Sequence, residues 1–208
     1  MSVILCYGDS NTHGTMPMTI AGQSLRHPRG QRWPDAMARL LGPDHEVLSE
    51  GLPGRTTVHD DVVEGGERNG IKVLPAILHS HKPIDLLIVM LGTNDLKPRY
   101  GVTAYEIARS VERIVLAAQA EGVHRRTLVI SPAPVRETGT LRDVFAGAQT
   151  RQTGLEGHLQ DVATRHGAAF LEAGAHACVS DGDGVHWEAP EHERFGAVMA
   201  TTVRGLLS

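Results

Sequence analysis

The stretch Val3-Ile4-Leu5-Cys6-Tyr7, followed directly by Gly8-Asp9-Ser10-Asn11-Thr12-His13-Gly14, decides the fold of this chain. A continuous apolar run predicts a strand that is buried on both faces, since a strand with one solvated face would alternate apolar and polar side chains. Such strands form parallel sheets, and ligands bind at the carboxyl edge of these sheets. Ser10 therefore stands at the place where a reactive side chain is expected.

Similar apolar segments recur along the chain, and segments of helical period separate them. A capping box of Thr103 and Glu106 starts one of these helices, and Gly122 ends it. The other predicted strands are residues 46–49, 85–91, 127–131 and 168–171, and the other predicted helices are residues 33–41, 71–81, 155–167 and 190–206.

This alternation of strands and helices predicts the α/β class, as a three-layer α/β/α sandwich around about five parallel strands. A length of 208 residues favours a single domain over residues 1–208. Residues 51–69 and 132–145 are long connections, and loops of such length are usually functional or face a partner.

Composition excludes several classes of partner. The net charge of -4 argues against binding to nucleic acid or to a membrane surface. No apolar run approaches the about 20 residues that span a bilayer, and the first strand begins too early for a leader. We therefore expect a soluble, cytoplasmic protein.

A second polar cluster, Asp181-Gly182-Asp183-Gly184-Val185-His186-Trp187, lies near the end of the chain. A nucleophilic serine needs a base within hydrogen-bond reach and a carboxylate that orients this base. Asp183 and His186 are three residues apart and can supply both from one loop. An ordinary Asp/Gly turn would also explain the cluster, and Ser10 would equally serve to cap backbone amides.

Two more polar turns follow predicted strands. Gly54 would let a backbone N–H approach a ligand closely, and Asn94, after the strand at residues 85–91, would project an amide into the same crevice. Each turn alone is common. Four of them at one edge of a sheet indicate a catalytic site.

The blocks Gly8-Asp9-Ser10, Gly54, Gly92-Thr93-Asn94-Asp95 and Asp183-x-x-His186 resemble those of the SGNH hydrolases, also called the GDSL esterases and lipases. The similarity extends from about residue 3 to the last predicted helix, and the branch it most resembles contains bacterial arylesterases, acyltransferases and acetylesterases. It implies a flavodoxin-like sandwich, an ester hydrolase that needs no cofactor and no metal, and a homo-oligomer.

The resemblance also implies a role for each block. Ser10 would be the nucleophile, His186 the general base and Asp183 the residue that orients the imidazole. The backbone N–H groups of Ser10 and Gly54 and the side-chain amide of Asn94 would form the oxyanion hole.

The chain departs from the family pattern beside the serine. Asn11 replaces the usual leucine and His13 replaces an aromatic residue, and both positions flank the acyl pocket in the family. Trp187 would either wall the site or pack as a core aromatic. The substrate preference of relatives therefore does not transfer directly.

Substrate class is predicted only broadly. Aromatic residues make up 4% of the chain and no segment resembles a long lipid groove, so we expect hydrolysis of short acyl esters, chiefly acetyl, of aryl, alkyl or carbohydrate alcohols. Transfer of the acyl group to an alcohol is a second expectation. Residues 132–145 are a candidate interface element of the oligomer.

Two other functions remain open at this point. His79-x-His81 and His59-Asp60-Asp61 hold metal-binding side chains, which allows a metal-dependent hydrolase. A non-catalytic ligand-binding module on the same scaffold is the other alternative.

Overall fold

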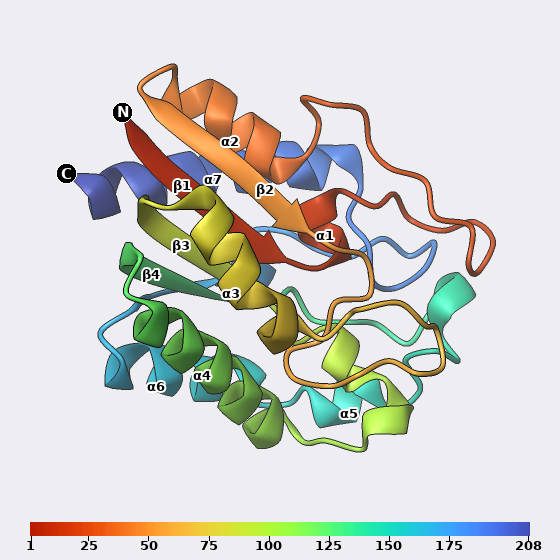
Figure 1. The fold of residues 1–208 in the computed structure, drawn as a ribbon. Coiled ribbons are helices and arrows are strands. Elements are labelled where there is room, and N and C mark those ends of the chain that lie inside the picture. Colours follow the sequence, from red (N-terminus) through yellow and green to blue (C-terminus); the bar gives the residue numbers. More distant parts are fainter.

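A single five-stranded sheet runs through the molecule, and all its strands are parallel, in the order β2-β1-β3-β4-β5 (Figure 1). The computed structural model describes residues 1–208. Each predicted strand is present within three residues of its predicted bounds, which confirms the α/β class. The strands are β1 (Ser2–Gly8), β2 (His45–Gly51), β3 (Ile84–Met90), β4 (His124–Ser131) and β5 (Ala169–Glu172).

The five predicted helices are also present, and two helices of four residues each were not predicted. These two, α1 and α5, are too short for an apolar period to be visible in the sequence. The helices are α1 (Ser10–His13), α2 (Trp33–Leu41), α3 (Gly70–His81), α4 (Ala104–Glu121), α5 (Ala148–Arg151), α6 (Leu155–Arg165) and α7 (Ala189–Leu207). The capping box of Thr103 and Glu106 begins α4 as predicted, and Gly122 ends it in the left-handed conformation.

The helices form two layers, with α2 and α7 on one face of the sheet and α3, α4 and α6 on the other (Figure 1). Successive side chains of a strand point to opposite faces. In β1, Ile4 and Cys6 accordingly pack in the core beside α2 and α7, while Leu5 and Tyr7 pack in the core beside α3 and α4. Both faces of β1 are covered, so its sequence is continuously apolar.

The strand order brings the carboxyl ends of β2, β1 and β3 side by side. Because β1 lies between β2 and β3, the segments that follow these three strands meet at one edge of the sheet, on the right of Figure 1. Helix α1 and the connections after β2 and β3 are therefore neighbours. None of the helices is long and apolar enough to cross a bilayer.

Candidate active site

Ser10 is the first residue of α1 and follows β1 after a single intervening residue. That residue, Asp9, caps the helix, because its side chain accepts a hydrogen bond of 3.0 Å from the Asn11 N–H. Gly14 ends the helix after one turn in the left-handed conformation. The Ser10 side chain is thereby held at the floor of a cavity of about 430 Å³ at the carboxyl edge of the sheet.

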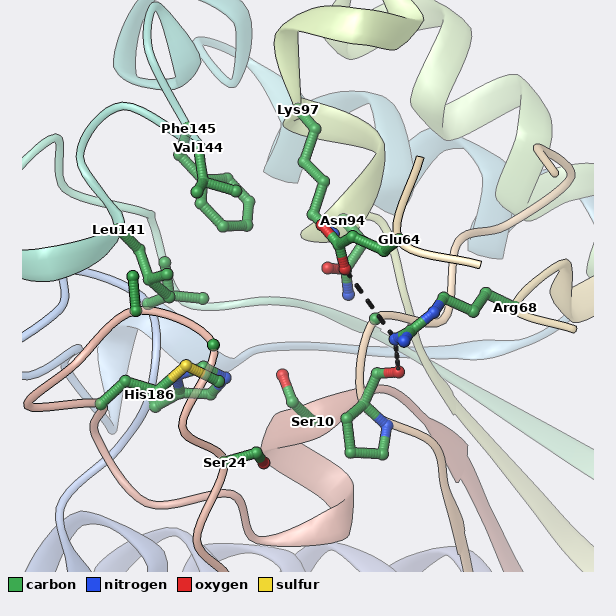
Figure 2. A pocket seen from close by; sticks show the side chains of 16 residues that line it. Ser10, Ser24, Glu64, Arg68, Asn94, Lys97, Leu141, Val144, Phe145 and His186 are labelled. Carbon is green, nitrogen blue, oxygen red and sulfur yellow. Dashed lines mark hydrogen bonds and ion pairs between the residues drawn. The ribbon is translucent and has the colours of Figure 1, made fainter. Parts of the chain in front are cut away.

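His186 lines the same cavity and is bound to a buried carboxylate. Its Nδ1 lies 2.6 Å from Oδ2 of Asp183, and Figure 2 shows the imidazole directed toward the Ser10 hydroxyl. Asp183 is fully buried and accepts three backbone N–H bonds, from Val185 and His186 at 2.9 Å and from Met18 at 2.8 Å. Burial alone would raise the pKa of Asp183, but the hydrogen bonds from His186 and from these amides lower it below its ordinary value. The carboxylate is therefore ionised and fixes the orientation of the ring.

The loop that carries Asp183 and His186 follows β5, at the far edge of the sheet from β2. The 132–145 segment holds this loop in place: the Arg136 N–H donates to the Gly184 carbonyl at 2.9 Å and the Thr140 N–H donates to the Gly182 carbonyl at 3.0 Å. Gly184 has a φ of +77°, and a Cβ there would lie 2.0 Å from the Arg136 carbonyl oxygen. Only glycine allows this contact.

Three hydrogen-bond donors converge on the cavity opposite His186. The N–H groups of Ser10 and Gly54 have no backbone acceptor, and Gly54 adopts a φ of +79°. The side-chain nitrogen of Asn94 donates one hydrogen to the Arg55 carbonyl at 3.1 Å, which leaves its second hydrogen for the cavity (Figure 2). The residues predicted for the oxyanion hole thus come together around one space.

Arg55 is a buried cation that supports this arrangement, and its role was not predicted. Its Nη1 donates to the Gly8 carbonyl at 2.8 Å and to the Glu50 carbonyl, at the ends of β1 and β2. The guanidinium carbon lies 4.2 Å from the centre of the Tyr7 ring, a cation–π contact. Burial lowers the pKa of Arg55. Arg55 therefore ties two strand ends to the turn that carries Gly54.

Asp95 stabilises the turn after β3 in a similar way. It is fully buried and accepts hydrogen bonds from the Thr57 hydroxyl at 2.5 Å and from the Thr57 N–H at 3.1 Å. Burial raises the pKa of Asp95 to about 7, although the bonds from Thr57 oppose this. The contact fixes the loop after β2 against the turn that presents Asn94.

The cavity has two unlike walls. Apolar side chains from the 132–145 segment form one wall, and charged side chains from the 51–69 loop and the turn after β3 form the other. The lining residues apart from Ser10, Gly54, Asn94 and His186 are Met18, Ala21, Gly22, Ser24, Pro53, Glu64, Arg68, Lys97, Leu141, Val144, Phe145 and Val185.

Most of the residues in these two walls belong to the two long connections noted in the sequence. The length of these connections was the only sign in the sequence that they have a role. The apolar side chains Val135, Leu141 and Phe145 of the second connection are buried within the chain's own core, and Val144 is partly buried against it.

Asn11, His13 and Trp187 do not line the cavity, which corrects the expectation for Asn11 and His13 and leaves Trp187 with the second of its two predicted placements, as a core aromatic. Asn11 is buried, and its side chain donates to the Val185 carbonyl at 3.1 Å. His13 lies 3.2 Å from the Thr15 hydroxyl, and burial lowers its pKa to about 4. Trp187 is fully buried and packs edge-on against Phe195, with ring centres 5.0 Å apart.

The histidines considered for metal binding lie apart from one another. His79 bonds to Glu121 and His81 to Glu50, each at 2.8 Å, and His59 stacks on Tyr100. The structure contains no group of three or more His, Cys, Asp or Glu side chains placed to hold a metal ion.

Comparison with known proteins relates this geometry to a family. The model of the GDSL-like lipase/acylhydrolase family matches residues 6–192. The aryl esterase of M. smegmatis is 32% identical with a TM-score of 0.95, and the match covers 100% of both chains. A carbohydrate acetylesterase from Sinorhizobium meliloti is 33% identical with a TM-score of 0.93, over 99% of this chain and 100% of the other.

A carbohydrate acetylesterase family member from the same organism is 36% identical with a TM-score of 0.90, over 100% of this chain and 99% of the other. A comparison with curated proteins found no significant match. The match over most of the chain, together with the sandwich fold and the four blocks at one sheet edge, confirms the resemblance and the prediction of a carboxylic ester hydrolase: the chain belongs to the GDSL-like lipase/acylhydrolase family.

Proposed function

We propose that the protein is a serine esterase that hydrolyses short acyl esters, chiefly acetates, of aryl, alkyl or carbohydrate alcohols. The observation that carries this proposal is the Asp183–His186 pair, bonded at 2.6 Å, on the same cavity as Ser10 and the donors of Gly54 and Asn94. A hydroxyl, an oriented base and an oxyanion site are the three parts that acyl transfer to serine requires.

The proposed reaction has two halves. In the first, Ser10 attacks the ester carbonyl while His186 takes its proton, and the three donors hold the negative charge that forms on the carbonyl oxygen. The ester C–O bond then breaks as His186 returns the proton to the leaving alcohol. In the second half, His186 takes a proton from water as the water attacks the acyl carbon. The bond between this carbon and Ser10 Oγ then breaks, His186 returns the proton to Ser10, and the acid is released.

A short acyl group agrees with the activity of two similar structures, which are described as a carbohydrate acetylesterase and a member of that family. We further propose that alcohols compete with water for the acyl-enzyme, because the wall formed by Leu141 and Phe145 is apolar. Adding increasing amounts of an alcohol during hydrolysis of an aryl acetate should then yield the new ester at the expense of acetate.

The decisive experiment is a panel of aryl esters of increasing acyl length, together with acetylated sugars. Wild type should hydrolyse acetates fastest, and Ser10→Ala should lose at least about 10³-fold in kcat. Ser24→Ala is the matched control, because Ser24 lines the same cavity and has no part in the proposed mechanism. Ester hydrolysis that survives in Ser10→Ala would refute the proposal, and loss of activity with a chelator would favour a metal-dependent hydrolase.

We also propose that the chain forms a homo-oligomer. Four of its large exposed apolar side chains stand on segments that contribute residues to the cavity: Ile20 and Leu25 lie between α1 and α2, and Val62 and Val63 lie on the 51–69 loop. Contiguous exposed apolar surface is typical of faces that bind a partner. Light scattering should give a mass above that of one chain, and a monomer mass would contradict this proposal.

A further inference from the structure

Arg68 lies on the charged wall of the cavity, directly beside the proposed oxyanion hole. Its Nε donates to the Gly65 carbonyl at 2.7 Å and its Nη1 to the Pro53 carbonyl at 2.5 Å, so the guanidinium is fixed. It packs against Gly54, where an added Cβ would lie 2.0 Å from Nη1. The Nη2 group makes no hydrogen bond in the protein, and Figure 2 shows the side chain reaching into the cavity.

The charges around Arg68 do not cancel. Lys97 bonds to Glu64 at 2.6 Å and Arg99 bonds to Asp61 at 3.0 Å, which pairs two cations with two carboxylates. Although burial opposes them, the bonds to these cations lower the pKa of Glu64 and help to lower that of Asp61, so both carboxylates are ionised. The carboxylate nearest to Arg68 is Glu64, at 3.9 Å. The wall therefore carries one positive charge in excess, on Arg68.

The opposite wall is formed by Leu141, Val144 and Phe145. An occupant that satisfies both walls has an apolar body on one side and a negative group on the other. A guanidinium with free N–H groups binds a carboxylate through charge-assisted hydrogen bonds, which are about twice as strong as neutral ones. With 25% of its side chain exposed, Arg68 is partly shielded from solvent, so this attraction is not fully screened.

We propose that Arg68 is a specificity residue that selects substrates carrying a carboxylate. This inference rests on the proposed esterase function. Because the proposed acyl group is short, the carboxylate belongs to the alcohol half of the ester, and the preferred substrates are acetates of hydroxylated aromatic or alicyclic acids. Ser10 attacks the acetyl carbon, the ester bond breaks, and the hydroxy acid leaves with its carboxylate unchanged.

The test compares 4-acetoxybenzoate with its methyl ester, in which a neutral group replaces the carboxylate, and follows release of the phenol so that only cleavage of the acetyl ester is counted. Each kcat/KM is divided by the rate of hydroxide-catalysed hydrolysis, so that intrinsic reactivity cancels. Wild type should prefer the anionic ester by about tenfold. Arg68→Met should abolish this preference, Arg68→Lys should keep part of it, and added salt should weaken it in wild type. Arg142→Met, an exposed arginine on the segment of the opposite wall, should leave the preference unchanged.

Several results would overturn the inference. A normalised ratio near one in wild type, or an unchanged ratio in Arg68→Met, would show that Arg68 does not select for charge. If Arg68→Met slowed both esters equally, its role would be confined to holding the loop at Pro53 and Gly54. A preference seen only for 4-nitrophenyl adipate over its methyl ester would place the anion on the acyl half instead.

Failure of the proposed esterase function would be visible separately. In that case Ser10→Ala would hydrolyse both esters as fast as wild type does, whatever the ratio between them.

Discussion

Asp183 shows how much a single residue contributes to the proposed chemistry. Its carboxylate accepts the Nδ1–H of His186, which leaves Nε2 free to take the proton of Ser10. In Asp183→Asn the side-chain amide would donate to Nδ1 instead and favour the wrong tautomer. We expect kcat to fall by about 10²- to 10⁴-fold with little change in KM.

Asp181→Asn is the control for this change. Asp181 lies in the same loop, its side chain is 78% exposed, and it pairs with Arg136 on the surface. Steady-state kinetics on an aryl acetate should show wild-type rates for this variant. If Asp183→Asn kept more than about a tenth of the wild-type kcat, orientation by the carboxylate would be dispensable.

Arg55 should affect catalysis although it acts only through the residues that it positions. It does not line the cavity, but it joins the Gly8 and Glu50 carbonyls, and its own carbonyl orients Asn94. Arg55→Met should lower kcat by about 10- to 100-fold with a small change in KM, because a displaced oxyanion donor weakens binding of the transition state only. Arg55→Lys should recover part of the loss.

Stability must be measured beside the kinetics, because Arg55 is buried. Arg194→Met is the comparison, since Arg194 on α7 also donates to a backbone carbonyl, that of His176, but lies outside the cavity lining. It should alter Tm without altering kcat. A kcat for Arg55→Met that equals wild type in folded protein would show that Arg55 serves stability alone.

At the scale of elements, the 51–69 loop is held against the turn after β3 by ion pairs. Lys97 is 4% exposed and lies 2.6 Å from Glu64, so this pair is shielded from solvent far more than a surface pair. A double-mutant cycle with Lys97→Met and Glu64→Gln should give a coupling free energy of only about 1 kcal/mol, because Glu64 is 34% exposed and solvent screens part of the attraction. Loss of the pair should also raise KM, since both residues line the cavity.

An ion pair between the same loop and α3 is the matched control. Lys72 and Asp60 are 2.6 Å apart, but their side chains are 50% and 54% exposed. The corresponding cycle should show no measurable coupling and no change in KM. Equal coupling in the two cycles would mean that burial adds nothing to the Lys97–Glu64 pair.

At the scale of the whole molecule, the sequence predicts the sheet and the proposed triad but not the cavity. The strands are recognisable because burial on both faces demands a continuous apolar run, as in β1 and β3. Ser10, Gly54 and Asn94 follow neighbouring strands, so parallel order alone brings them together. Arg68 and Lys97 carry no such signal, because their positions depend on contacts between loops distant in the chain.

The position of Trp187 and the presence of α1 also could not be predicted from the sequence, for physical reasons. Trp187 stands next to His186 in sequence, but its side chain is directed into the core beside α7, and no local pattern distinguishes these two directions. Likewise α1 has only four residues, so the helix that positions Ser10 leaves no periodic trace.

We expect His192 to make the stability of the whole fold depend on pH. It is fully buried where α7 meets α2: its Nδ1 accepts the Trp33 N–H at 3.3 Å, and its ring lies 5.0 Å from that of His27. Burial, and then the neighbouring His27, lower the pKa of His192 to about 3. An unfolded chain would protonate this imidazole near pH 6.5. Between these values the unfolded state binds the extra proton, so stability falls as the pH drops from about 6.5 toward 3.

His192→Asn removes the titrating group while its side-chain oxygen can still accept the Trp33 N–H. Asp95, whose pKa is raised to about 7, acts in the opposite direction over the same range, so the variant must be compared with wild type at each pH. Urea unfolding at pH 7 and pH 4.5 should show wild type losing about 2–3 kcal/mol more than His192→Asn. Equal losses of unfolding free energy in the two proteins would mean that His192 binds its proton as readily in the folded state as in the unfolded state. The contact between α2 and α7 would then tolerate a charged imidazole.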